Sequence, residues 1–292
     1  MMNTPIPGSA FGANGQLTSG VGVNASVGYG NYNALFGTLK MANWHGVTLQ
    51  QNFTWGKALG TTAVQQATSQ FTVVDPYNIG NDYGPQPFDR KFVYNLLMVY
   101  EPPFYKGQHG ALGRVLGGWS FAPILFAASG LPLEINTTNG DSQAFGAGDS
   151  TNYFNDENGV LMCANNYGSA RHNGVTGSGG IGTNGNVNMF ANPAAVWNCL
   201  RNPILGLDTG HNGGAGNVFR GMPFWNVDFQ VRKNIHLTER FSLEVQSIFT
   251  NVFNHDQLGD PVLDLSNPAG FGVMSTQGNT PRSIEIGGRI RF

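Results

Sequence analysis

Residues Phe224–His255 read FWNVDFQVRKNIHLTERFSLEVQSIFTNVFNH, and apolar and polar side chains alternate through both halves. In the first half one face holds Trp225, Val227, Phe229 and Val231. In the second half the same pattern returns as Phe241, Leu243, Val245 and Phe249. An apolar side chain at every second position is typical of a β-strand with two unlike faces. The segment therefore predicts two strands joined by a connection at Asn234–Arg240.

Alternation of the same kind predicts further strands on both sides of this pair. The clear ones are Asn33–Met41, Val47–Trp55, Lys91–Glu101, Trp119–Ser129 and Ser283–Phe292. A weaker eighth strand is predicted at Val21–Val27. The fold class predicted from this pattern is all-β, with about seven or eight antiparallel strands.

The connections between the predicted strands alternate in length along the chain. The shorter ones are Ala42–Gly46, Pro102–Gly118 and Asn234–Arg240, and the longer ones are Gly56–Arg90, Gly130–Phe224 and Asn251–Arg282. Transmembrane β-barrels have short periplasmic turns and long extracellular loops, whereas a soluble sandwich has no reason to sort them. If the chain ends in the periplasm, every longer connection lies outside the cell.

Composition excludes several classes of protein. Only 11% of the 292 residues are Asp, Glu, Lys or Arg, whereas soluble domains carry about 25%. The 12% of aromatic residues argues against disorder, and a net charge of −2 argues against a nucleic-acid partner. No apolar stretch approaches the roughly 20 residues of a spanning helix. A membrane barrel remains compatible, because it combines alternating strands with a moderate mean hydropathy, here −0.18.

Aromatic residues fall at the ends of the predicted strands, where a membrane barrel has its two interfacial girdles. The candidate girdle residues are Trp55, Tyr100, Trp119, Trp225 and Phe241. The last strand places Ile284, Ile286, Ile290 and Phe292 on one face and stops on Phe292. This ending resembles the terminal signature of bacterial outer-membrane proteins, which the barrel-assembly machinery reads.

Charged residues of the strands share the polar face. They are Asp228, Arg232, Glu244, Glu285, Arg289 and Arg291. In a barrel these charges would face the lumen, because a charge at the lipid-facing midplane costs about 2–4 kcal/mol. In a soluble sandwich they would form the solvent face, so this feature alone does not separate the two folds.

Several ordered segments resemble one family of outer-membrane proteins. Phe224–His255 and Gly270–Phe292 look like the closing strands of TonB-dependent transporters of the Oar-like type, which are abundant in acidobacteria. Four upstream segments match the same group: Asn31–Leu35, Phe53–Lys57, Phe88–Phe92 and Leu116–Trp119. The resemblance covers nearly the whole chain except Gln143–Gly221.

This resemblance implies a barrel of 22 strands, an N-terminal plug, a TonB box and, in this branch, a leading carboxypeptidase-regulatory-like module. We expect residues 1–292 to be the C-terminal part of such a barrel, without plug, TonB box or signal peptide in this chain. The expected location is the outer membrane. The expected partners are outer-membrane lipid, the barrel-assembly machinery, an unknown extracellular substrate, and TonB only through the absent plug.

Few residues suggest local chemistry. Cys163 and Cys199 both lie in the longest connection, and a disulfide between them is the preferred interpretation, with two free thiols or pairing elsewhere as alternatives. The six histidines have no metal-ligand spacing, and no nucleophile elbow is present. We therefore expect neither an enzyme nor a bound metal or cofactor.

Three functions remain open from the sequence. The first is the C-terminal barrel portion of a TonB-dependent receptor, which contributes wall and substrate-binding loops to active uptake. The second is a self-contained eight-stranded outer-membrane barrel with an adhesin or structural role, which uses Val21–Val27 as its first strand. The third is a secreted β-sandwich that binds glycan.

Overall fold

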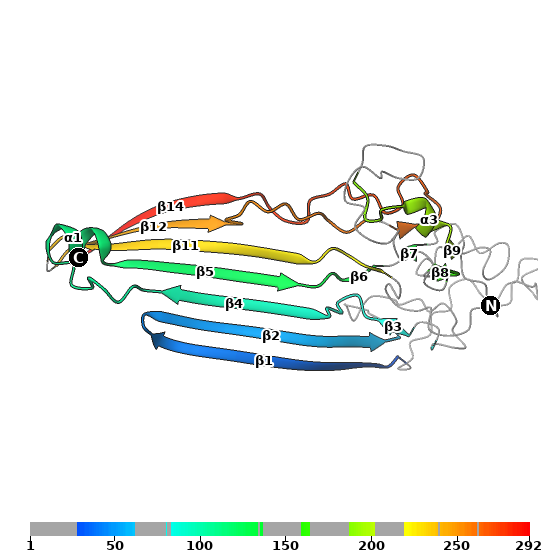
Figure 1. Ribbon diagram of the computed structural model, residues 1–292, viewed down its shortest axis with the longest axis horizontal. Coiled ribbons are helices and arrows are strands. Elements are labelled where there is room, and N and C mark those ends of the chain that lie inside the picture. Colours follow the sequence, from blue (N-terminus) through cyan, green and yellow to red (C-terminus); the bar gives the residue numbers. More distant parts are fainter. Residues whose placement is uncertain are drawn as a thin grey trace, which may run out of the picture.

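The computed structural model describes residues 28–61, 80, 83–133, 135–136, 159–163, 187–201, 219–238, 240–261 and 263–292. Its long strands are β1 (Gly30–Trp44), β2 (Val47–Gly60), β4 (Phe92–Tyr100), β5 (Trp119–Ala128), β11 (Phe224–His236), β12 (Ser242–Thr250) and β14 (Ser283–Arg291) (Figure 1). Each of the seven clearly predicted strands is therefore present. The weaker one, Val21–Val27, lies outside the described residues.

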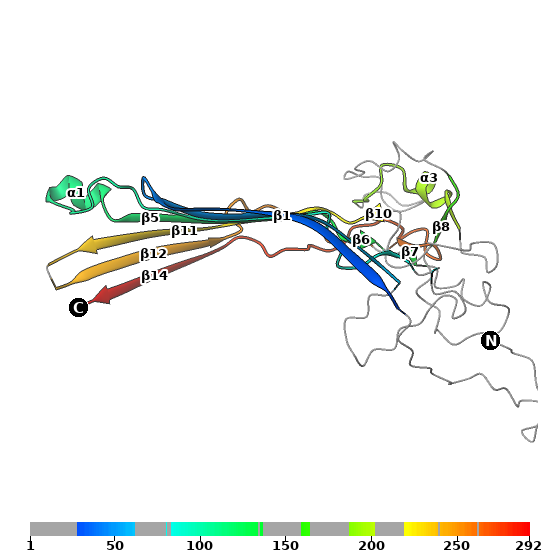
Figure 2. The same cartoon turned by 90° about the horizontal axis from the view of Figure 1, so that it is seen from below.

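These strands form one antiparallel sheet in the order β1-β2-β4-β5-β11-β12-β14. Every long strand lies beside its neighbour in sequence, and the short β3 (Gly84–Pro85) pairs with the end of β2. Figure 2 shows the long strands nearly edge-on as a single curved layer. The predicted antiparallel β architecture is confirmed.

Short and long connections lie at opposite ends of this sheet. One end, which we call the short-connection end, holds residues 45–46, 101–118 and 237–241 between successive strands. The other, the long-connection end, joins the strands through residues 61–91, 129–223 and 251–282. Figure 1 shows the short-connection end on the left together with the C-terminus. The predicted alternation of lengths is therefore a property of the fold.

The first hairpin is longer than the sequence pattern predicts. Instead of ending at Trp55, β2 continues to Gly60 and pairs with β1 as far as Gly30. Beyond Trp55 it no longer pairs with β4. Backbone groups on this unpaired edge of β2 find other partners. The Asp89 carboxylate accepts a hydrogen bond from the Ala58 amide at 2.6 Å, and β3 pairs with Leu59 and Gly60. Alternation fades after Trp55, which is why the prediction stopped there.

At the short-connection end, the predicted loop Pro102–Gly118 contains a helix, α1 (Gly110–Leu116). The Gln108 side chain beside it donates to the Asn234 carbonyl at 2.7 Å and accepts from the His236 amide at 3.0 Å. It thereby continues the ladder of β11 past the first residue of β5. Gly118 adopts φ +72°, and a side chain there would collide with the Asn234 carbonyl.

Among the described residues, a buried hydrophobic cluster lies in the long connections. We call it the loop module, and its buried members are Leu133, Ile135, Phe190, Val196, Cys199, Leu200, Phe219, Leu263 and Phe271. Short elements build it: β6 (Pro132–Leu133), β7 (Ile135–Asn136), β8 (Val160–Leu161), α3 (Pro193–Trp197), β9 (Leu200–Arg201), β10 (Phe219–Arg220) and β13 (Leu263–Asp264). Pairing of β6 with β10, β7 with β13 and β8 with β9 holds these pieces together.

Two separate connections contribute to the loop module. Phe190, from the β5–β11 connection, stacks on Phe271, from the β12–β14 connection, with ring centroids 5.6 Å apart. The fully buried Asn188 donates to the Phe271 carbonyl and accepts from the Phe190 amide, both at 2.8 Å. Because a buried amide with both functions satisfied fixes its neighbours, these contacts join the two connections into one unit.

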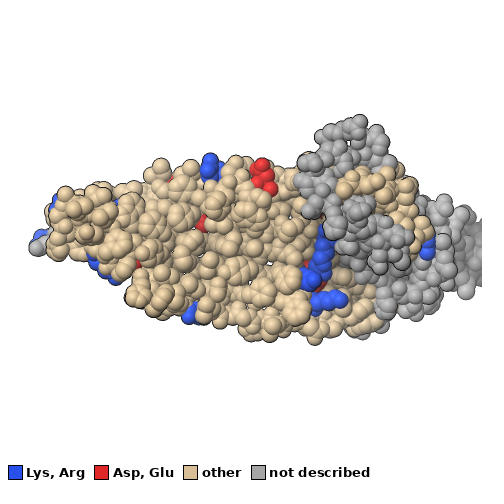
Figure 3. Space-filling view, viewed as in Figure 1, with Lys and Arg blue, Asp and Glu red and all other residues tan. Residues whose placement is uncertain are grey.

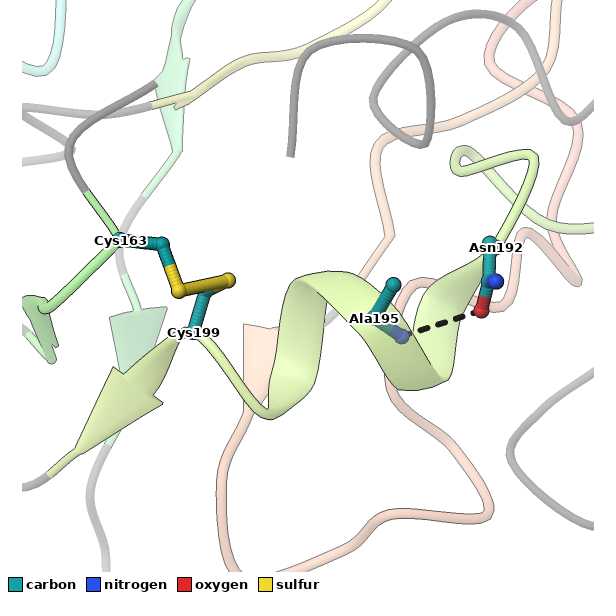
Figure 4. The surroundings of a disulfide bond; sticks show 4 residues. All are labelled: Cys163, Asn192, Ala195 and Cys199. Atoms are coloured by element: carbon teal, nitrogen blue, oxygen red, sulfur yellow. Dashed lines mark hydrogen bonds between the residues drawn. A yellow bond between two sulfur atoms is a disulfide. The ribbon is translucent and has the colours of Figure 1, made fainter. Parts of the chain in front are cut away.

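A disulfide joins Cys163 to Cys199 inside the loop module, with a Cα–Cα distance of 5.1 Å (Figure 4). Cys199 lies between α3 and β9, directly after the helix. Asn192 begins that helix, and its side chain accepts a hydrogen bond from the Ala195 amide at 3.0 Å. The pairing preferred from the sequence is thus the one that the structure contains.

An ion pair connects the loop module to the sheet. Arg220 of β10 donates to the carboxylate of Asp89, to the Asp89 carbonyl at 3.0 Å and to the Gly130 carbonyl at 3.4 Å. The Asp89 side chain is 1% exposed and also accepts from the Ala58 amide of β2. The Asp89 carboxylate, in the segment before β4, therefore binds both the long-connection end of β2 and Arg220 of the loop module.

We expect Asp89→Ala to lower the free energy of unfolding by about 2 kcal/mol. This is less than the 3–5 kcal/mol of a fully buried pair, because the Arg220 side chain keeps 33% of its exposure and stays partly hydrated. Urea titration followed by tryptophan fluorescence measures the change. Asp256→Ala, at an exposed aspartate, is the control and should leave the midpoint unchanged. Equal midpoints for Asp89→Ala and the original chain would contradict the assignment.

Replacement of both cysteines, Cys163→Ser with Cys199→Ser, should loosen the loop module while the sheet stays folded. The sequence separation of 36 residues corresponds to about 3–4 kcal/mol of lost chain entropy. Limited proteolysis should therefore cleave the variant faster in the loop module than in the strands. The original chain treated with reductant provides the matched comparison. Identical cleavage rates with and without the disulfide would refute this prediction.

Candidate functional site

Strand register assigns the side chains of the sheet to two unlike faces. Trp55 lies opposite both Leu35 and Phe92, and this row belongs to the face that we call the apolar face. Its exposed members within the strands include Leu35, Leu39, Phe53, Trp55, Phe92, Trp225, Val245, Ile284, Ile286 and Ile290. Monomeric soluble proteins rarely expose so large a continuous apolar surface. Figure 3 shows how few charged side chains lie over the strands on one side.

Two polar side chains on the apolar face, Gln51 and Lys233, have hydrogen-bond partners. Gln51 accepts from the Tyr94 hydroxyl of the neighbouring strand at 2.8 Å. The ammonium group of Lys233 donates to the Val115 and Gly117 carbonyls at the end of α1, and it lies 4.7 Å from the ring centroid of Trp119. Lys233 is only 8% exposed, and these carbonyls compensate its buried charge.

The opposite face, the polar face, carries the strand charges singled out from the sequence. The register places Asp228, Arg232, Glu244, Glu285, Arg289 and Arg291 on it. Arg291 pairs with Glu244 at 2.7 Å, and Arg232 lies 3.5 Å from Glu101. Asp228 acts differently, since its carboxylate accepts from the Asn251 amide at 2.9 Å and fixes the turn after β12. Two of these charges, Glu244 and Arg291, are thus paired between the neighbouring strands β12 and β14, and Arg232 is paired with Glu101 beyond β5.

The five candidate girdle residues share the apolar face. Tyr100, Trp119 and Phe241 lie at its short-connection end, where Phe121 stacks against both Tyr100 and Trp119. Trp225 lies near the long-connection end, with the His255 ring stacked on it at 4.0 Å. Trp55 is an interior residue of β2 but lies level with Phe92, the first residue of β4. Two aromatic rows therefore bound the apolar face.

The C-terminal strand completes this face. Its four signature residues, Ile284, Ile286, Ile290 and Phe292, point to the same side as Phe249 and Leu243 of β12. Phe292 is 96% exposed. The terminal aromatic side chain is therefore accessible at the short-connection end.

Sequence reasoning missed three polar residues that organise the ends of the strands: Asp89, Gln108 and Lys233. Asp89 and Lys233 had a detectable signal, because each is a charge in a charge-poor chain and Lys233 interrupts the apolar face of its strand. Gln108 had none, since an isolated glutamine in a loop has no periodicity.

The described residues contain no group of three or more His, Cys, Asp or Glu that could hold a metal ion. None of the helices within the described ranges is long and apolar enough to cross a membrane.

Comparison with protein families gives a match that covers most of the chain. A model of the outer membrane beta barrel domain matches residues 2–285. A search of curated proteins found no match. The antiparallel sheet with its exposed apolar face, its two aromatic rows and its sorted connections agrees with that description. The chain belongs to the outer membrane beta barrel domain family and is located in the outer membrane.

Proposed function

We propose that the chain forms the C-terminal part of the wall of a TonB-dependent outer-membrane transporter. Its long connections would contribute to the surface that binds the extracellular substrate. The resemblance of its ordered segments to Oar-like transporters supports this proposal, together with the architecture described above. Members of the outer membrane beta barrel family are typically not enzymes, and we assign no catalytic step to the chain.

The two faces of the sheet suggest its orientation in the wall. The apolar face is the one suited to lipid, and the polar face to the lumen, where water and opposite charges compensate Glu244 and Arg291. Short connections of such barrels are periplasmic and long ones extracellular. The loop module therefore lies outside the cell in this proposal. In a transporter, the charges of the polar face would contact the plug, and TonB would act through that plug.

The observation that carries the proposal is the pair of open sheet edges. Within the described residues, β1 pairs only with β2, and β14 only with β12. An unpaired backbone amide in hydrocarbon costs several kcal/mol, so strands at open edges require further partners. A larger barrel supplies them from the rest of its wall.

A soluble β-sandwich fits these observations poorly. It requires a second sheet over the apolar face, but the long strands within the described ranges form one sheet only. Ile286 of that face is 78% exposed, which a sandwich core would not leave. The family match places the chain in the outer membrane instead.

Reading the genomic DNA upstream of the Met1 codon tests the transporter proposal directly. We expect an in-frame extension that encodes more alternating strands and a plug. A stop codon immediately upstream, preceded by a promoter, would overturn the proposal and leave the self-contained barrel as the better interpretation.

Cysteine labelling in cells checks the orientation. Ala269, in the β12–β14 connection, and Ala111, in α1, are both exposed alanines at opposite ends of the sheet. On intact cells a membrane-impermeant maleimide should label Ala269→Cys but not Ala111→Cys. Permeabilising the outer membrane should expose Ala111→Cys. Labelling of Ala111→Cys on intact cells would reverse the orientation.

Electrophoretic migration distinguishes a wall segment from a self-contained barrel. After refolding of residues 1–292 in detergent, we expect no compact band that resists dodecyl sulfate until heated, because the edges at β1 and β14 stay open. A small closed barrel such as an adhesin would give that band. A small outer-membrane barrel of eight strands, refolded in parallel, serves as the positive control.

A further inference from the structure

The connection between β4 and β5 exposes an unusual number of apolar side chains at the short-connection end. On α1, Leu112, Val115 and Leu116 are 68%, 64% and 39% exposed. They are spaced at i, i+3 and i+4, so they form one stripe along the helix. Phe104 and Tyr105, just before the helix, are each about half exposed and contact one another edge to face.

Well-defined contacts hold α1 in place with that stripe outward. Gly113, on another side of the helix, is buried, and a side chain there would collide with the Gln108 backbone. At the last turn Lys233 donates to the Val115 carbonyl at 2.9 Å, and the Trp119 indole donates to the same atom at 2.9 Å. The exposure of Leu112 is therefore a consequence of how the helix is docked.

The stripe adjoins the apolar face of the sheet. Lys233 and Trp119, which bind the end of α1, both belong to that face by register. Tyr100 and Phe121 stand beside Trp119 in the aromatic row of the short-connection end. The helix is thus anchored on the side of the apolar face, at the short-connection end.

Charge on this connection complements an anionic surface. Glu101 is the only acidic residue in 101–118, and its partner is Arg232 of the polar face. Lys106 and Arg114 are exposed and form no ion pair with any described residue. Arg114 lies about 200° around the helix from Leu112, away from the apolar stripe. Such a helix is basic on its polar side and apolar on the other.

We propose that α1, together with Phe104 and Tyr105, is an interfacial element embedded in the periplasmic leaflet of the outer membrane. Leu112, Val115 and Leu116 lie among the acyl chains, and the basic groups of the connection face the phosphates of anionic phospholipid. Helices of this kind bind membranes through buried apolar area combined with attraction to anionic lipid. The proposal depends on the outer-membrane location and on the orientation proposed above, but not on the transporter role.

Accessibility of single cysteines tests it in the outer membranes of cells that produce the protein. The native cysteines are joined in the disulfide and do not react. After permeabilisation, a membrane-impermeant maleimide should label Leu112→Cys at least about tenfold more slowly than Arg114→Cys, on the opposite side of the helix, the ratio that burial of one leucine-sized side chain supports. Val115→Cys, on the same stripe, should behave like Leu112→Cys and guards against a local folding defect.

Two outcomes would overturn the proposal. If Leu112→Cys and Val115→Cys react as fast as Arg114→Cys, the stripe faces water. Lipid contact has a further signature, since in vesicles of phosphatidylethanolamine and phosphatidylglycerol a nitroxide on the acyl chain should quench a fluorophore at Leu112→Cys more strongly than one at Arg114→Cys. If the stripe cysteines react slowly but this difference in quenching is absent, a protein surface covers the stripe.

Discussion

Backbone amides in hydrocarbon have no water to bind, so each must find its partner within the sheet. Strand-to-strand pairing meets that need along most of the wall. Where a strand outruns its neighbour, a side chain takes over: the Asp89 carboxylate binds the free amide of Ala58 at one end, and the Gln108 amide binds β11 at the other. The Ser129 hydroxyl does the same for the Phe92 amide at 3.1 Å. Polar side chains at the strand ends thus bind the backbone groups that strand pairing leaves without a partner.

Alternation was sufficient to predict the seven long strands and their antiparallel order, because a lipid-exposed sheet needs unlike faces at every second residue. Alternation did not predict the parts of the fold that contacts distant in sequence stabilise. Residues 56–60 of β2 lack alternation and are held by Asp89, which is far away in sequence. The helix α1 is too short for a periodic signal. Lys233 breaks the apolar pattern because its partners are carbonyls of that helix.

The loop module was the least predictable part of the structure. Its cysteines could be paired from their number and position in one connection, but its aromatic core could not. Phe190, Phe219 and Phe271 come from three distant segments, and none of them lies in a periodic stretch. The Asp89–Arg220 ion pair connects their cluster to the sheet, together with backbone contacts such as the hydrogen bond from the Gly221 amide to the Leu131 carbonyl. Contacts between residues far apart in sequence therefore build this part of the fold, and no local pattern announces them.

The strand order also restricts how many further strands a closed barrel needs. Successive strands reverse direction, so β1 and β14, the first and seventh in the order, run the same way. An antiparallel barrel cannot close by pairing them directly, and single-chain outer-membrane barrels have an even number of strands. A closed barrel that contains this sheet must then add an odd number of strands between β1 and β14. The alternative barrel with Val21–Val27 as its eighth strand meets this requirement, and so does the proposed 22-stranded barrel, with fifteen further strands.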